Sequence, residues 1–294
     1  MKKKSSKRCL FALFSVLILF GTWSSIKSAE AQRVDDVVPV VALLMTAKEG
    51  TIPDEQNKIG TGFFVVDTTA NKLFLVTARH LVSTLTLNSL AVIRVKDDFP
   101  QEIPLTQLVG MNSPLAWRVH PTADIAVLTL NPAKDILPLL HTLARETLLK
   151  ELEAPSRDVP LTILGFPSGI GVQGRFSPIS RETKPASGLL NVPKISAASI
   201  FLLQDPIAGG FSGAPVFEFP GAHPSARAAI EIGGRFACVG LASATISDQT
   251  GGKLGVVVPA KYILEAMDSG TPASQRQIPK ATIKSSTTIE HYPR

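Results

Sequence analysis

The stretch AGGFSGAPVF, residues 208–217, places a serine between glycines and directly before an apolar run of strand length. Gly210 and Gly213 allow a tight backbone around Ser212, so the N–H groups of Gly210 and Ser212 can both point at an oxygen that gains negative charge. An ordinary glycine-rich hairpin turn is the alternative interpretation. A serine hydroxyl becomes a good nucleophile only when a base takes its proton, so the sequence has to supply that base elsewhere.

Two motifs earlier in the chain offer a base and an acidic partner for it. His80 closes the motif TARH, immediately after the apolar run KLFLVT, and Asp124 opens the apolar run DIAVL. A carboxylate in this position can accept the Nδ1 proton of a histidine, hold its tautomer and stabilise the imidazolium. Taken alone, each residue also has a structural interpretation: His80 could be a surface histidine, and Asp124 could cap a turn.

The apolar pattern outside these motifs is that of an all-β protein. Short runs such as GTGFFVVD and LAVIRV, and after Pro160 PLTILGFP and FACVGLASATI, are separated by Gly, Asn, Asp or Pro, which predicts two β units of similar size. Between them, residues 144–153 favour a helix, and a final amphipathic helix is expected after Pro259 with Gly270 as its stop signal. The segment 165–188 is rich in Gly, Ser and Pro and predicts long mobile loops.

The three motifs together, in the order His80, Asp124, Ser212, resemble the trypsin-like (chymotrypsin-fold) serine peptidases. The resemblance covers most of residues 38–268 and is strongest to the bacterial exported group that includes the DegP/HtrA-type proteases, without a PDZ domain. It implies two six-stranded Greek-key β-barrels with the active site in the cleft between them, followed by a short C-terminal helix. It also implies that the amides of Gly210 and Ser212 form the oxyanion hole.

The resemblance further implies a set of substrate-binding residues. Ser243 falls where the family has a serine that supports the triad aspartate, and the backbone of Ser243, Ala244 and Thr245 falls where the substrate strand is paired. Pro206 holds the position that often sets the charge of the specificity pocket, which favours a small or medium apolar residue before the cut. A shift of one position would place Asp205 there and select Lys or Arg. Loops such as 165–188 can order the oxyanion hole in related enzymes, although an inert surface loop is an equal alternative.

The ends of the chain carry signals of their own. Residues 1–31 combine a basic start, an apolar run from Cys9 to Trp23 and a small-x-small site at Ala29–Ala31, which predicts a secretory signal peptide and a periplasmic or extracellular protein. An uncleaved membrane anchor is the alternative. We expect the N-terminal barrel and linker at 32–155, the C-terminal barrel and terminal helix at 156–270, and a disordered tail at 271–294.

Composition excludes several other classes of function. Without the leader, 24 basic and 23 acidic residues remain, so the whole-chain pI of 9.4 does not predict a nucleic-acid partner. The five histidines are scattered and there is no H-E-x-x-H, so we expect no metal and no cofactor. The expected function is an exported serine endopeptidase acting on proteins or peptides, without stable membrane insertion after leader cleavage. The alternative is a catalytically inactive or latent protein of the same fold that binds peptides.

Overall fold

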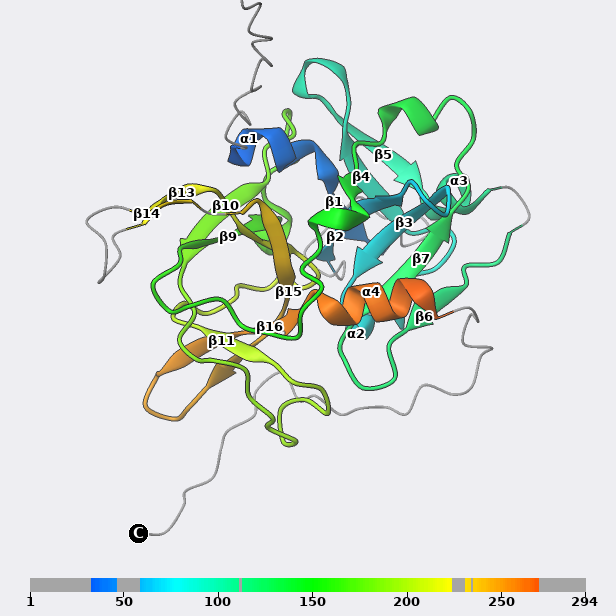
Figure 1. The fold of residues 1–294 in the computed structure, drawn as a ribbon. Helices are drawn as coiled ribbons and strands as arrows, with labels where there is room; N and C mark the ends of the chain where they lie inside the picture. The colour runs from blue at the N-terminus through cyan, green and yellow to red at the C-terminus, as the bar shows by residue number, and fades with distance from the viewer. Residues whose placement is uncertain (1–32, 47–58, 111–112, 224–230, 234, 270–294) are drawn as a thin grey trace, which may run out of the picture. The chain divides into compact units, whose positions relative to one another are not determined.

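The computed structural model describes residues 33–46, 59–110, 113–223, 231–233 and 235–269. The predicted signal peptide and the predicted tail from residue 271 lie outside these ranges. Within them the chain is mostly β, with two curled sheets and a few short helices (Figure 1). None of the helices in the described ranges has both the length and the apolar character needed to cross a membrane.

The first sheet is built from the first half of the chain and is antiparallel except for one short pairing. Its strands follow the order β5 (Pro100–Pro104), β4 (Leu90–Arg94), β1 (Val41–Met45), β2 (Ile59–Asp67), β3 (Lys72–Thr77), β7 (Ala126–Leu130) and β6 (Trp117–Val119). The two-residue strand β8 (Leu143–Ala144) pairs with β2 in parallel.

The second sheet is antiparallel and comes from the second half of the chain. Its strand order is β10 (Ile179–Thr183), β9 (Leu161–Gly165), β12 (Pro215–Glu218), β15 (Ala237–Ser247), β16 (Lys253–Pro259) and β11 (Phe201–Leu203). A separate pair joins β13 (Gly221–His223) to β14 (Glu231–Gly233). The all-β class and the two-sheet architecture are therefore confirmed, with the short strands β6 and β8 taking the first sheet to eight strands rather than the six that the resemblance implied.

The helical elements are short and lie between or after the strands. The α-helices are α1 (Val34–Val37), α2 (Arg79–Val82), α3 (Leu105–Val109) and α4 (Lys261–Asp268), and the 3-10 turns are η1 (Val38–Val40), η2 (Lys96–Asp98), η3 (Leu137–Leu139), η4 (Arg145–Thr147) and η5 (Pro167–Gly169). The expected C-terminal helix is present as α4 and ends before Gly270.

Alternation along the strands of the first sheet divides the apolar side chains between two cores. Phe63 and Val65 of β2 belong to a core that also contains Ile163 and Val216 of the second sheet, whereas Phe64 points into a separate core within the first sheet. Successive side chains of a strand point to opposite faces, so one strand contributes to both cores. The first sheet is thus buried on both faces, and the two sheets share the larger core.

Two sequence predictions about the connections were wrong. Residues 144–153 contain the turn η4 and no α-helix, because Leu148 and Leu149 are buried and the Leu149 N–H donates to the carbonyl of Cys238 at 3.0 Å. Pairing with the second sheet therefore outweighs helix propensity here. The segment 165–188 is not only loop, since it contains η5 and strand β10, which pairs with β9.

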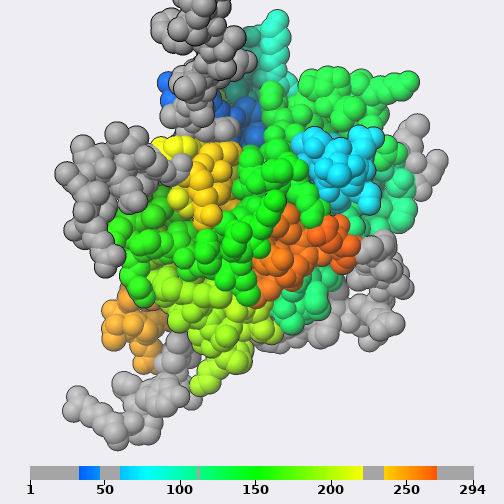
Figure 2. Space-filling view, viewed as in Figure 1, coloured from blue at the N-terminus to red at the C-terminus, as the bar shows by residue number. Residues whose placement is uncertain are grey.

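Helix α4 belongs by sequence to the second half of the chain but packs on β6 and β7 of the first sheet (Figure 1), and it lies at the surface (Figure 2). The guanidinium of Arg118, on β6, donates to the carbonyls of Met267 and Ser269 at 3.1 and 3.0 Å and to Thr129 Oγ1 at 2.7 Å. It also lies over the ring of Phe74, 5.2 Å from the ring centre. One buried arginine therefore donates to a carbonyl in the last turn of α4 and to that of the residue directly after it.

We expect Arg118→Met to lower the free energy of unfolding by about 2–3 kcal/mol, because two helix-end carbonyls lose a charged donor. For a chain of this length that corresponds to a fall in Tm of about 5–10 °C. Thermal unfolding followed by circular dichroism measures it. Arg94→Met is the matched control, since Arg94 pairs with Asp98 on the surface and should matter little. Equal Tm values for the two variants would contradict this role of Arg118.

Candidate active site

The side chains of His80 and Asp124 form a close pair at one end of the first sheet. His80 is the second residue of α2, directly after β3, and Asp124 stands two residues before β7, which pairs with β3. His80 Nδ1 lies 2.7 Å from Asp124 Oδ2, and the His80 N–H donates to Asp124 Oδ1 at 2.9 Å. An ionised carboxylate only accepts hydrogen bonds, so Nδ1 carries the proton and Nε2 keeps a lone pair to act as a base.

The surroundings of Asp124 keep it ionised although it is almost buried. Burial raises its pKa, but the hydrogen bond and charge of His80, the hydroxyl of Ser243 and the His80 amide outweigh burial, and the net pKa is lowered. The Ser243 hydroxyl donates to Asp124 Oδ2 at 2.6 Å. Three donors thus hold the carboxylate in one orientation behind the His80 ring.

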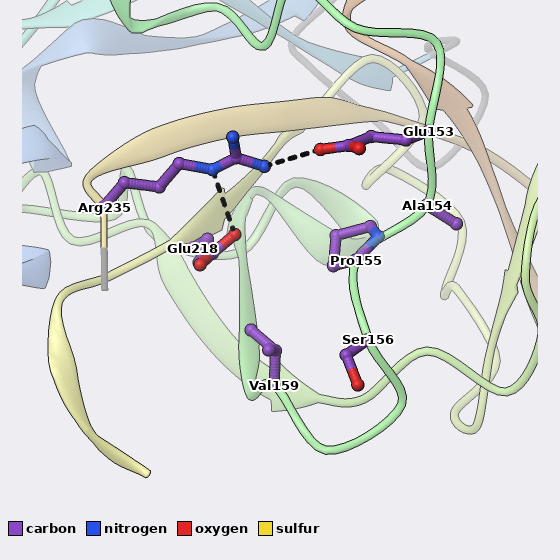
Figure 3. Close-up of a pocket in the computed structure, with 7 residues that line it drawn as sticks. All are labelled: Glu153, Ala154, Pro155, Ser156, Val159, Glu218 and Arg235. Atoms are coloured by element: carbon purple, nitrogen blue, oxygen red, sulfur yellow. Dashed lines mark hydrogen bonds and ion pairs between the residues drawn. The ribbon is translucent and has the colours of Figure 1, made fainter. Parts of the chain in front are cut away.

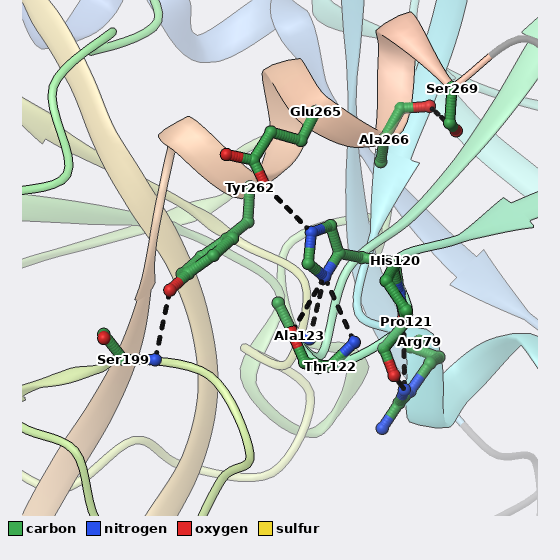
Figure 4. A network of polar contacts seen from close by, with 10 residues as sticks. All are labelled: Arg79, His120, Pro121, Thr122, Ala123, Ser199, Tyr262, Glu265, Ala266 and Ser269. Carbon is green, nitrogen blue, oxygen red and sulfur yellow. Dashed lines mark hydrogen bonds and ion pairs between the residues drawn. The ribbon is translucent and has the colours of Figure 1, made fainter.

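The loop that carries Asp124 is itself held by a second, buried histidine (Figure 4). His120 Nδ1 accepts the Ala123 N–H at 2.9 Å, so its proton is on Nε2, which lies 3.0 Å from Glu265 Oε2 on α4. The His120 N–H in turn donates to the carbonyl of Ile125 at 2.9 Å. His120 therefore ties the residues around Asp124 to the C-terminal helix.

Ser212 lies in the turn before β12, at a point where the backbone requires glycine. Gly210 and Gly213 have φ values of +97° and +89°, which L side chains rarely adopt. A Cβ on Gly213 would lie 2.0 Å from the carbonyl oxygen of Thr61, and one on Gly210 would lie 2.3 Å from that of Phe166. The turn is thus packed directly against β2 and against the segment after β9.

The hydroxyl of Ser212 points at the second sheet. It donates to the carbonyl of Ser243 at 3.1 Å, and within the described residues it makes no hydrogen bond to His80. Ser243 links the two halves of the site, since its hydroxyl contacts Asp124 and its carbonyl accepts from Ser212. The structure therefore brings together His80, Asp124, Ser212 and Ser243, with the serine hydroxyl turned away from the base.

The N–H groups of Gly210 and Ser212 are available to a ligand. Within the described part of the chain, neither donates a hydrogen bond to a protein acceptor, whereas the flanking Phe211 and Gly213 N–H groups donate to Ala208 and Ala242. Two free amides on one tight turn are what an oxyanion requires.

Of the remaining predicted substrate-binding residues, Ala244 and Thr245 lie on β15, and Pro206 lies in the segment between β11 and the turn that carries Ser212. Thr245 Oγ1 donates to the carbonyl of Ile207 and accepts its N–H, both at 2.7 Å, while Ala244 follows a bulge in β15. Pro206 is half-buried, and its carbonyl accepts from Arg181 at 3.0 Å.

The charge of Asp205 is already paired. Arg181 Nη2 lies 3.3 Å from Asp205 Oδ1, so a basic substrate side chain would meet a carboxylate that already has one cationic partner. Arg181 was not a predicted site residue. It sits on β10, within the segment that was predicted to be loop, and a lone arginine there gives no signal in the sequence.

The free thiol of Cys238 is a further nucleophile by type, but it is fully buried, and burial raises its pKa to about 12. We expect no alkylation of Cys238 by iodoacetamide at pH 8 in the folded protein, because the thiolate is almost absent and the reagent has no access. Peptide mapping by mass spectrometry tests this, with the same reaction in guanidinium chloride as the control. Rapid modification of the native protein would show that Cys238 is exposed.

A shallow pocket of about 560 Å³ lies elsewhere on the second sheet (Figure 3). Arg235 crosses it, with Nη2 2.9 Å from Glu153 Oε1 and Nε 3.6 Å from Glu218 Oε2. It contains none of the residues of the candidate active site. Arg235 is shared between the two carboxylates, so the charged side chains of the pocket carry a net negative charge.

Among known proteins, this chain is similar to solved structures, at low sequence identity. The active form of the Rv3671c protease from M. tuberculosis is 17% identical (TM-score 0.44), with 80% of this chain and 82% of that chain covered. A scabies mite inactivated protease paralogue is 15% identical (TM-score 0.49; 81% and 96%), and mouse neuropsin, a serine protease of the limbic system, is 16% identical (TM-score 0.47; 81% and 98%). No family model and no curated protein matches the chain.

Proposed function

We propose that this protein is a serine endopeptidase in which Ser212 is the nucleophile, His80 the general base and Asp124 the residue that orients it. The observation that carries the proposal is the chain of contacts from Ser212 through Ser243 to Asp124 and His80. Next to it lie the amides of Gly210 and Ser212, which donate to no acceptor among the described residues. The resemblance of the three motifs to trypsin-like peptidases supports it. The signal-peptide pattern of residues 1–31 supports export to the periplasm or the cell exterior as part of the proposal.

The proposed reaction is acyl transfer through protein side chains and water. When the Ser212 hydroxyl rotates from the Ser243 carbonyl to His80, its Oγ attacks the peptide carbonyl carbon while His80 Nε2 takes the proton. The amides of Gly210 and Ser212 bind the oxyanion. His80 then protonates the leaving amine as the C–N bond breaks, and water, activated by His80, releases the acyl group from Ser212.

The surroundings of Pro206 favour cleavage after small or medium apolar residues. Of the residues that flank Pro206, Asp205 is paired with Arg181, and the buried Ile207 is apolar and has its backbone held by the Thr245 hydroxyl. A substrate lysine or arginine would approach Asp205 beside the positive charge of Arg181. We therefore take Pro206, rather than Asp205, as the residue beside the substrate side chain.

A second candidate function is peptide binding without cleavage. It is favoured by one observation, the hydrogen bond that holds the Ser212 hydroxyl on the Ser243 carbonyl and away from His80. Catalytic hydrogen bonds are often incomplete in structures without substrate, and one side-chain rotation restores this one. We therefore place the protease first.

One experiment separates the two candidates. The purified protein is incubated with a fluorescent peptide library and with an unfolded protein, and products are identified by mass spectrometry while peptide binding is followed by fluorescence anisotropy. Internal cuts that are absent with Ser212→Ala support the endopeptidase. Binding with no cuts in either protein supports the second candidate and contradicts the first.

A further inference from the structure

We propose that Thr61 is a positioning residue that fixes the oxyanion hole from the first sheet. The inference rests on the proposed protease function and adds to it a residue that no motif singled out. Thr61 lies on β2, which contributes no side chain to the triad, and it is completely buried. Its side chain nevertheless contacts the turn that carries Ser212.

All polar groups of Thr61 are engaged at the junction of the two sheets. Its N–H donates to the carbonyl of Ser212 at 2.8 Å, and its carbonyl accepts the hydroxyl of Thr77 at 2.7 Å. Its hydroxyl donates to the carbonyl of Gly210 at 2.8 Å and accepts the N–H of Phe166 at 3.1 Å. Thr61 therefore makes hydrogen bonds to two carbonyls of the turn that carries Ser212 (the nucleophile turn), those of Ser212 and Gly210.

The hydroxyl also joins the nucleophile turn to the turn η5. Phe166 precedes η5, and the N–H of Ser168 within η5 donates to the carbonyl of Gly209 at 2.8 Å. In a trans peptide the C=O and N–H groups point in opposite directions. Holding the Gly209 carbonyl on Ser168 therefore directs the Gly210 N–H, the proposed oxyanion donor, away from η5.

Thr61 sets the position of both sides of this contact. Its hydroxyl contacts the Gly210 carbonyl and the Phe166 N–H, so the nucleophile turn and the residue before η5 are tied to one hydroxyl. The Gly209 carbonyl accepts from Ser168 and the following Gly210 carbonyl accepts from Thr61, so the Gly209–Gly210 peptide is held on both sides. Ser168 has φ +51°, a conformation that a non-glycine residue keeps only when its surroundings enforce it. Without the hydroxyl, two buried backbone groups lose their partner, and both segments are free to rearrange.

The test compares Thr61→Val, which keeps the shape and removes the hydroxyl, with Thr61→Ser, which keeps the hydroxyl. For Thr61→Val we expect kcat on a peptide amide to fall about 10- to 100-fold, less than for complete loss of an oxyanion donor, with KM within about twofold. Thr61→Ser should stay within about threefold of the parent. Thr147→Val is the matched control, because its hydroxyl donates to the Ala144 carbonyl at 2.7 Å in η4 and contacts no site residue.

A second readout separates positioning from general destabilisation. A peptide aldehyde forms a hemiacetal with the serine, and the hemiacetal oxygen occupies the oxyanion hole. The product peptide on the amine side of the cut carries no carboxylate at its cleaved end, so its binding does not use the oxyanion hole. We expect Thr61→Val to weaken the aldehyde at least tenfold and the product peptide less than twofold, with Tm recorded for every variant. If Thr61→Val is unfolded at the assay temperature, Thr61→Ala at lower temperature replaces it.

The outcomes distinguish this inference from the proposed function. Parental kcat and aldehyde affinity in folded Thr61→Val, with Ser212→Ala inactive, would overturn the role of Thr61 and leave the protease intact. Equal losses in Thr61→Val and Thr147→Val would also overturn it, because they would reflect stability alone. Turnover that survives in Ser212→Ala would instead remove the proposed function on which the inference rests.

Discussion

Ser212→Ala is expected to lower kcat on a peptide amide by roughly 10⁵- to 10⁶-fold. The variant loses the oxygen that forms the acyl-enzyme. The amides of Gly210 and Ser212, which have no acceptor within the part of the chain that the structure describes, remain and leave a small residual rate over water. Steady-state kinetics with a peptide amide on the parent and the variant measure the ratio. KM should change little, because the deleted hydroxyl contributes to the transition state rather than to substrate binding.

Ser89→Ala is the matched control for this loss. Ser89 is completely buried and its Oγ accepts the N–H of Thr86 at 2.8 Å, outside the candidate active site. We expect its kcat to equal that of the parent even if its Tm falls. An unchanged kcat in Ser212→Ala would contradict the proposed nucleophile whatever the control does.

Asp124→Asn is expected to lower kcat by about 10⁴-fold with little change in structure. The amide of asparagine can donate to His80 Nδ1, which would place the imidazole proton on Nε2 and remove the base that faces the substrate. Kinetics across pH 5–9 with a peptide amide measure the loss. A variant that retains more than a tenth of the parental kcat would contradict the role of Asp124.

Asp67→Asn is the matched control, since Asp67 is also a nearly buried carboxylate of the first sheet. It accepts the Ala70 N–H at 2.8 Å and pairs with Arg145 at 2.9 Å, and these contacts lower its pKa against the effect of burial. We expect Asp67→Asn to be less stable than the parent but equally active. A comparable loss of kcat in both variants would show that the effect at Asp124 is not specific.

Stability against pH follows from the same carboxylate. The pKa of Asp124 is lower in the folded state than the value of about 3.9 in an unfolded chain. Ionised Asp124 therefore stabilises the fold fully above that value, and the stabilisation is lost as the pH falls through the folded pKa. Asp124→Asn should accordingly remove part of the loss of stability below pH 4.

The fold class and the site motifs were predictable because they depend on local pattern. The unbroken apolar run FFVV of β2, a strand that is buried on both faces, and the glycines around Ser212 express strand burial and backbone freedom within single segments. The order of the motifs placed His80 and Asp124 in the first unit and Ser212 in the second. The structure places these three residues on the expected sides of the junction between the sheets.

The features that sequence did not reveal depend on contacts between distant residues. Thr61 reaches Gly210 across 149 positions, and His120 reaches Glu265 across 145, with nothing local to mark either pairing. The helix predicted at 144–153 failed for the same reason, because Leu149 pairs with Cys238 of the second sheet. Helix and strand propensities depend on the segment alone, whereas these contacts depend on the distant segment that packs against it.

The most direct measurement is the reaction of the purified protein with a fluorophosphonate probe, followed by mass spectrometry of the modified peptide. An activated serine displaces fluoride from phosphorus, while its neighbouring histidine takes the proton. We expect one adduct, on Ser212, that is absent in Ser212→Ala and in His80→Ala. A folded parent protein that takes up no probe, or an adduct on another serine, would contradict it.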